Sequence, residues 1–393
     1  MTAPEVEQSI PAFRTPGAIE WRPLAAPDNG DDAQKKEAKS AKDELNNTLL
    51  ASLQMQHLVV LAGSGCSRSA GGPTMDDLWN SAVGREPSAA ALRVAKRVHH
   101  DLADANIELF LSKIEAYLQV NEVKAIRMYL NSCKEVILQK CSGFLQSEML
   151  DAHETFLHRL SRRRVRDSRL KVFTTNYDLC FERATSELGG IALDGFSFTA
   201  PRRYDPRFFG YDIIRRQRGS DELGHYLEGV FLLYKLHGSV NWARAENGAT
   251  SQKEQPKPEE ACLIYPARGK YQQSFTQPHL ESMAQYLAAV REPNTCVLVV
   301  GFGFNDDHLA EPLLAAAKSN PHLRIIIADL DAQANAESGN RYWKQFFDLG
   351  ERGEDIWFIA VGFEDFAQMI PDLKSLTPAD ALMKSIQSVM RER

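Results

Sequence analysis

Four separate runs of apolar residues each end in a short polar or glycine-rich segment, and this feature constrains the fold most. The runs are His57–Ala62, Leu170–Thr174, Phe231–Leu236 and Cys296–Val300. Continuous apolar runs of this length are typical of strands buried on both faces of a parallel sheet. In such sheets ligands bind beyond the carboxyl ends of the strands. We therefore expect the four segments that follow the runs to converge; they are called the first to fourth tips and comprise residues 63–67, 175–178, 237–239 and 301–306.

The segments after these runs indicate how the sheet is built. Candidate helices at Gln277–Arg291, Asp306–Lys318 and Gln333–Phe347 alternate with candidate strands at Leu323–Ala328 and Trp357–Val361. Alternation of this kind is typical of right-handed βαβ crossovers. The sequence therefore predicts an α/β fold with a doubly wound, mostly parallel, Rossmann-like sheet.

Three further regions complete the predicted organisation. Residues 86–150 have apolar residues at helical spacing and predict a helical insertion between the first two strands. Residues 1–31 contain five prolines and little periodicity, which predicts an extended N-terminal arm ahead of one domain over residues 32–393. Alternatively, the apolar side chains of this arm dock on a neighbouring subunit. A last helix is expected at Pro378–Met390.

Composition excludes several classes of function. The chain has 393 residues and a net charge of -6, so it is not built to coat nucleic acid or an anionic membrane. No run approaches the roughly 18 apolar residues of a membrane span, and no signal peptide is evident, so we expect a cytoplasmic protein. Six cysteines occur without a C-x-x-C pair or zinc-ligand spacing. The sequence therefore predicts no metal centre.

The first tip carries glycines suited to a bound diphosphate, and the fourth tip would meet the adenosine side of such a dinucleotide. Without a Cβ, glycine lets backbone N–H groups approach the ligand, and a following helix start favours its negative charge. Arg68 stands where the fingerprint of a dehydrogenase has its third glycine. The sequence therefore disfavours an enzyme that transfers a hydride. Each glycine tip is otherwise a tight turn without a ligand. The candidate contacts are Gly63, Ser64, Gly65, Ser67, Gly301, Gly303 and Asp306.

The second and third tips carry side chains suited to catalysis. The amide of Asn176 can bind a carboxamide or position a water, and is otherwise a turn or capping residue. His237 can accept a proton near neutral pH, and is otherwise held only by packing. Because both follow converging strands, we assign Asn176 and His237 as the catalytic pair. The remaining candidate contacts of these two tips are Thr175, Asp178, Gly238 and Ser239.

In this order the four tips resemble those of the sirtuin-like NAD-consuming family. That family has a Gly-Ala-Gly-x-Ser loop, a Thr-x-Asn segment, a His-Gly pair and a late glycine-rich turn. Here the first loop reads GSGCS, and the TTNYD and KLHGS strings look like those of bacterial sirtuin-like defence NADases. The resemblance covers roughly residues 55–330 and implies NAD as the substrate. It assigns catalysis to the same pair, Asn176 and His237.

The resemblance implies hydrolysis of NAD to nicotinamide and ADP-ribose, linear or cyclised, in anti-phage defence. The leaving pyridinium needs no strong acid, and the ribose passes through an oxocarbenium-like state, so a positioned water and one base suffice. Constant hydrolysis would kill the host, so control by a homo-oligomer or by a HerA-type ATPase partner is expected. Two alternatives are a module that senses NAD or ADP-ribose without turnover and a protein deacylase. The missing C-x-x-C pairs disfavour the deacylase, because deacylating sirtuins carry a zinc ribbon.

A basic segment, Arg159–Lys171, contains six arginines and one lysine. Such a segment is usually a solvated face. It alternatively meets an acidic protein partner, which we favour over nucleic acid because no aromatic residues are interleaved for base stacking.

Overall fold

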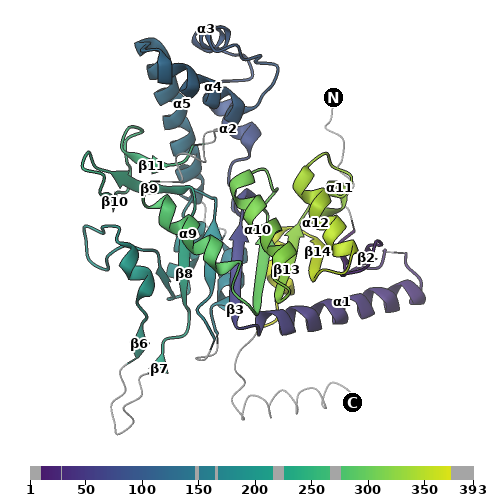
Figure 1. The fold of residues 1–393 in the computed structure, drawn as a ribbon. Coiled ribbons are helices and arrows are strands. Elements are labelled where there is room, and N and C mark those ends of the chain that lie inside the picture. The colour runs from purple at the N-terminus through teal and green to yellow at the C-terminus, as the bar shows by residue number, and fades with distance from the viewer. Residues whose placement is uncertain are drawn as a thin grey trace.

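A nine-stranded sheet runs through the molecule, and the four apolar runs form its middle (Figure 1). This computed structural model describes residues 10–27, 29–146, 150–163, 167–215, 225–265 and 276–372, so the helix expected at Pro378–Met390 lies outside the described residues. Adjacent strands from β14 to β5 are all parallel, which confirms the α/β fold with a mostly parallel sheet. The strands in spatial order are β2 (Arg22–Pro23), β1 (Ala12–Arg14), β14 (Ile356–Ala360), β13 (Leu323–Asp329), β12 (Thr295–Val300), β3 (His57–Ala62), β4 (Lys171–Thr174), β8 (Val230–Lys235) and β5 (Ile191–Leu193).

The four predicted strands are direct neighbours, in the order β12–β3–β4–β8. The parallel part of the sheet begins at β3, continues to β4 and β8 on one side, and later returns to β12 on the other side of β3. This reversal makes the carboxyl ends of β3 and β12 a topological switch point, where ligands of open α/β sheets bind. The four tips therefore share one edge of the sheet, as the sequence predicted.

Each face of the sheet carries its own apolar core, because strand side chains alternate between the two faces. On β3, for example, Val59 and Leu61 join one core, whereas Leu58 and Val60 join the other. No helix among the described residues is both long and apolar enough to cross a membrane. The first face is covered by α9 (His279–Ala289), α10 (Asp307–Ser319), α11 (Ala332–Asn335) and α12 (Arg341–Glu351). The second face is covered by α1 (Asp32–Leu53), α6 (Asp151–Leu160), α7 (Cys180–Glu187) and α13 (Phe363–Met369).

A helical block and a small antiparallel sheet share a third core. Figure 1 shows the block beyond the edge at which the parallel strands end. Phe110 and Ile114 of the block cluster with Val240 and Leu263 of the small sheet. The block is α2 (Met75–Ala82), α3 (Ala89–Arg97), α4 (Ile107–Val120) and α5 (Lys124–Gly143), so its helices begin before the predicted insertion at residue 86. The small sheet is β10 (Thr250–Gln252), β9 (Gly238–Arg244) and β11 (Ala261–Leu263), and β6 (Ile214–Arg215) pairs separately with β7 (His225–Tyr226).

Residues 12–14 and 22–23 belong to the central sheet, which corrects the prediction of an extended arm for the described part of residues 1–31; residues 1–9 of that prediction lie outside the described residues. β1 pairs antiparallel with β14, and β2 pairs with β1. Phe13 is fully buried and stacks on Trp357 with ring centroids 6.3 Å apart, and Leu24 is buried beside it. Pro23 is tolerated in β2 because β2 is the outermost strand of the sheet. The apolar side chains that we expected to dock on a neighbour are thus used within the chain.

Three described arginines of the basic segment, Arg159, Arg163 and Arg169, also bind within the fold, which corrects for them the expectation of a solvated face or an external partner. Arg159 donates to three carbonyls between residues 367 and 370, at the end of α13. Arg163 is buried and donates to three carbonyls between residues 53 and 56, just past α1. Arg169 pairs with Asp212 at 2.8 Å. Carbonyls at helix ends lack partners within the helix, and a guanidinium satisfies several at once.

Replacement of Phe13 tests whether the N-terminal strands are part of the folded core. We expect Phe13→Ala to lower the free energy of unfolding by about 3–5 kcal/mol, because a fully buried ring is lost from the sheet. Ile19→Ala is the matched control: Ile19 is 71% exposed, so its loss should change stability by less than about 0.5 kcal/mol. Urea unfolding followed by circular dichroism measures both. Equal stability of the two variants would contradict the assignment.

Candidate functional site

The first and fourth tips touch through their glycines. Gly63 N–H donates to the carbonyl of Val300 at 3.0 Å, and Gly65 N–H donates to that of Gly301 at 2.9 Å. A Cβ on Gly63 would lie 2.4 Å from the Gly301 oxygen, and Gly301 has a φ of +56°. Two backbones therefore meet at the switch point where no side chain fits. In the first tip, the side chain of Ser64 remains exposed.

Asn176 joins the second tip to the first. It follows β4, is 7% exposed, and its Nδ2 donates to the carbonyl of Gly63 at 2.9 Å and to Ser67 Oγ at 2.8 Å. These bonds use both amide hydrogens, so the carbonyl oxygen Oδ1 is the part of the side chain available to a ligand. An acceptor at this position suits a water molecule or the N–H groups of a carboxamide.

Ser67 and Asp178 lie behind Asn176 and hold it in place. Ser67 Oγ donates to Asp178 Oδ2 at 2.7 Å, and Asp178 Oδ1 accepts from Cys180 N–H at 3.0 Å, at the start of α7. Both side chains are buried. We therefore reassign Ser67 and Asp178 from ligand contact to positioning of the Asn176 amide. Thr175, between the strand and Asn176, is half-buried and stays a candidate contact.

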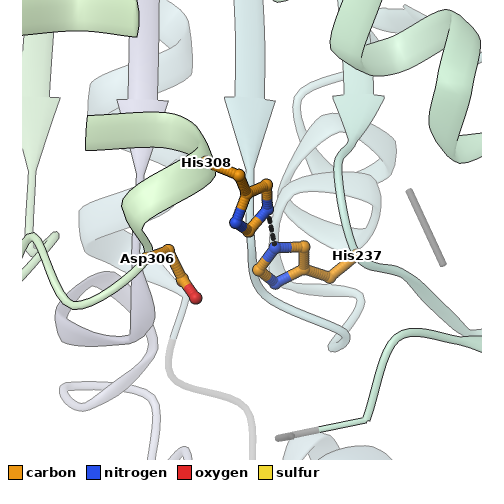
Figure 2. Close-up of side chains that lie close together, drawn as sticks. All are labelled: His237, Asp306 and His308. Carbon is orange, nitrogen blue, oxygen red and sulfur yellow. Dashed lines mark hydrogen bonds between the residues drawn. The ribbon is translucent and has the colours of Figure 1, made fainter. Parts of the chain in front are cut away.

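His237 follows β8 and faces the fourth tip. It is 2% exposed, its Nε2 lies 3.0 Å from His308 Nε2, and the two rings stack with centroids 5.1 Å apart. His308 lies near the start of α10, whose N-cap residue is Asp306. Figure 2 shows His237, Asp306 and His308 together at this edge of the sheet. The sequence indicated His237 and Asp306 but missed the pairing with His308; the Asp-x-His spacing after the fourth strand was the available signal.

Gly238 and Ser239 carry the chain from the central sheet into the small one. Gly238 has a φ of +85°, and a Cβ there would lie 2.1 Å from the carbonyl oxygen of Cys262. Ser239 is fully buried, and its Oγ donates to the carbonyl of Tyr177 at 3.4 Å. We therefore reassign both residues to structural roles. Among the predicted contacts of the fourth tip, Gly303 is exposed and Asp306 is half-buried.

The thiols near the tips are neutral. Cys66 of the first tip is fully buried, and this burial raises the pKa of its thiol well above the usual value. Burial has the same effect on the pKa of Cys180, at the start of α7. Because the thiolate is the nucleophilic form, neither cysteine is suited to covalent catalysis. Asn176 and the histidines therefore remain the candidate catalytic side chains of the tips.

His153 of α6 is buried behind the second tip. Its ring centroid lies 5.2 Å from that of Phe181 and 4.8 Å from that of Phe363. Neither ring nitrogen has a hydrogen-bond partner among the described residues. Burial lowers the pKa of His153 to about 4, although the nearby Asp178 carboxylate acts in the opposite direction. The ring is therefore neutral at physiological pH and becomes costly to keep buried in acid.

The fold and the tips define an α/β protein with a candidate ligand site at a topological switch point. Residues 170–347 match the family model described as a SIR2-like domain. The matched stretch runs from β4 into α12 and includes the second, third and fourth tips, but not the first. No curated protein matches the chain.

Solved structures of Sir2 homologues are similar at low identity. A Sir2 homologue in complex with NAD has 14% identity and a TM-score of 0.45, with 82% of this chain and 92% of that chain covered. A Sir2 homologue variant in complex with 2'-O-acetyl ADP-ribose has 13% identity and a TM-score of 0.44, with 86% and 99% covered. A further variant in complex with ADP-ribose has 16% identity and a TM-score of 0.40, with 78% and 95% covered.

A methyl group at Gly63 tests the contact between the first and fourth tips. We expect Gly63→Ala to lower the free energy of unfolding by about 3 kcal/mol, because its Cβ would overlap the backbone at Gly301. At Gly143, near the end of α5, a Cβ meets open space, so Gly143→Ala should be neutral or stabilising by up to about 1 kcal/mol. Chemical unfolding measures both changes. A neutral Gly63→Ala would show that the two tips separate at little cost.

His153 predicts a pH-dependent loss of stability. The unfolded chain binds the proton near pH 6.5 and the folded chain only near about 4, so stability is complete above pH 6.5 and falls as the pH drops toward 4. The loss from this group amounts to roughly 3 kcal/mol. His153→Leu should reduce this acid sensitivity and raise stability at neutral pH, because no unpaired nitrogen remains buried. Urea unfolding across this range measures it, and the exposed His322→Leu serves as control. An unchanged pH slope in His153→Leu would refute the assignment.

Proposed function

We propose that the protein hydrolyses NAD at the nicotinamide–ribose bond, giving nicotinamide and ADP-ribose in linear or cyclised form. One observation carries the proposal: four adjacent parallel strands bring two glycine tips, Asn176 and His237 to one edge at the switch point. The SIR2-like domain in residues 170–347 supports it, because that stretch includes the tips with both catalytic residues. The resemblance of the four tips to those of the sirtuin-like NAD-consuming family directs the proposal toward this substrate.

The residues divide between holding the dinucleotide and cleaving it. The diphosphate would lie against the backbone N–H group of Ser64 and near the positive end of α10. The nicotinamide ribose would then lie toward Asn176 and His237. Asn176 Oδ1 accepts a hydrogen bond from the attacking water or from the carboxamide, and His237 takes the proton of that water or of a ribose hydroxyl. The pyridinium leaves without an acid, so no further proton donor is required.

The proposed catalytic pair is buried in this structure, and this burial suggests how NAD hydrolysis is controlled. Asn176 and His237 are 7% and 2% exposed, so a dinucleotide reaches them only after the tips or the helical block move. A closed state suits an enzyme whose constant activity would be lethal. We therefore propose that assembly of a homo-oligomer, or a HerA-type ATPase partner, opens the site during anti-phage defence. The choice of partner and of defence rests on the resemblance of the tips.

The same burial also favours a second candidate, a module that binds NAD or ADP-ribose without turnover. Such a sensor keeps the glycine tips and needs no access for water. A protein deacylase is the weaker candidate, because the sequence has no C-x-x-C pair for a zinc ribbon. The three functions differ in one measurable respect, which is whether nicotinamide is released and whether this release requires an acetylated peptide.

The decisive experiment follows NAD by chromatography with the purified protein, alone and with the candidate ATPase. We expect nicotinamide and ADP-ribose without any peptide, and we expect Asn176→Ala and His237→Ala each to slow the reaction by about 10²–10⁴-fold, because positioning or proton transfer is lost. His322→Ala is the matched control on an exposed histidine and should retain the wild-type rate. Thermal melting confirms that each variant is folded.

Three results would contradict the proposal. Folded Asn176 and His237 variants with the wild-type rate would show that the pair is not catalytic. Calorimetric binding of NAD without turnover in every condition would identify the sensor. Nicotinamide release that depends on an acetylated peptide would identify the deacylase.

A further inference from the structure

We propose that His237, Asp306 and His308 bind one divalent transition-metal ion. The three residues come from two separate tips: His237 follows β8, whereas Asp306 and His308 lie at the start of α10. One potential ligand atom from each residue lies within 4.8 Å of the other two. Figure 2 shows the Asp306 carboxylate beside the two imidazole rings, whose Nε2 atoms meet. The composition and spacing of the chain did not predict this site, because its ligands are 71 residues apart in sequence.

The distance between the two imidazoles fits a shared ion. Their Nε2 atoms are 3.0 Å apart. Two nitrogens each about 2.1 Å from one metal ion are separated by roughly 3.0–3.4 Å, for ligand angles between right-angled and tetrahedral. Turning both rings out of their mutual hydrogen bond brings both lone pairs onto that ion. The Asp306 carboxylate, within 4.8 Å of one ring nitrogen of each histidine, completes the set by a side-chain rotation.

The surroundings of the cluster suit an ion held away from bulk water. His237 and His308 are 2% and 7% exposed, and Asp306 is half-buried. The positive end of α10 opposes a cation, and the negative charge of Asp306 at its N-cap offsets this effect. The neighbouring Asp307 points elsewhere: its carboxylate is 70% exposed and pairs with Arg341 at 3.2 Å. One carboxylate of the two is therefore placed for coordination.

The ligand set indicates which ions bind. Two imidazoles and one carboxylate suit zinc, cobalt, nickel or iron in the divalent state, whereas magnesium prefers oxygen ligands. Three protein ligands leave at least one position open for water or another small ligand, as in catalytic rather than structural zinc sites. Coordination also withdraws a lone pair of His237 from proton transfer. The metal-bound state and the base that we propose for NAD cleavage therefore exclude one another, a consequence that rests on the proposed function.

The test uses the full chain, freed of metal with a chelator, and a titration with Co²⁺ followed by visible absorption. We expect one ion per chain with the ligand-field bands of nitrogen and oxygen coordination, displaced by Zn²⁺ but not by Mg²⁺. His308→Phe keeps an aromatic ring and removes a ligand, and Asp306→Asn keeps the shape of the side chain; each should weaken binding by at least about 100-fold, since even outer contacts to metal ligands contribute 10–100-fold. His322→Phe, on an exposed histidine, should bind as the wild type does.

Absence of the cobalt bands, or equal affinity in the wild type and both ligand variants, would overturn the proposal. Thermal melting shows that the variants are folded, and Asp306→Asn decides the matter if His308→Phe is unstable. The absorption is measured without NAD, so it does not depend on hydrolysis. A cobalt site without NAD cleavage would refute the proposed function alone, and NAD cleavage without a cobalt site would refute the metal site alone.

Discussion

The contact between the first and fourth tips is the constraint on which the candidate site depends. β3 and β12 are neighbours, yet their tips lie far apart in the sequence, and the backbones at Gly63, Gly65 and Gly301 meet directly where the strand order reverses. A side chain at any of these positions would separate the two tips. Besides the proposed contact with a diphosphate, the glycines therefore have a structural role. They fix the distance between the first and fourth tips, beside which the ligand would lie. This contact also fixes Asn176, whose amide donates to the Gly63 carbonyl.

The site is built in two layers. An outer layer of Ser64, Gly65, Gly303 and Asp306 remains open or half-open, whereas Ser67, Asp178 and Ser239 are buried and bonded within the fold. The buried layer supports Asn176 and His237 rigidly, and it leaves little room for a ligand to reach them. Rigid support suits catalysis, because the reacting groups need not reorganise. Limited access suits control, since movement of a tip or of the helical block then decides whether substrate or a metal ion reaches His237.

The sequence predicted the parallel sheet and the meeting of the tips well, but it predicted the N-terminus poorly. The apolar runs are long and continuous, so the strands at 57–62 and 171–174 agree closely with the prediction. Residues 12–14 form a strand of three residues within a proline-rich segment, too short for periodicity to reveal. The sequence also did not predict the bonds that Arg159 and Arg163 form within the fold. Their partners are carbonyls at the ends of distant helices, which no charge pattern along the chain indicates.

What the sequence alone determined is therefore the set of strands and the residue types at their polar ends, because burial on both faces leaves a continuous apolar signature. Tertiary structure decided which of those residues face the ligand and which support them. Ser67 and Asn176 look alike as small polar residues at strand ends, but hydrogen bonding turns one into a support and the other into a candidate catalyst. The tertiary structure also decided the pairing of His237 with His308. That pairing depends on the distance between two strand ends, which is set by packing across the sheet and not by spacing along the chain.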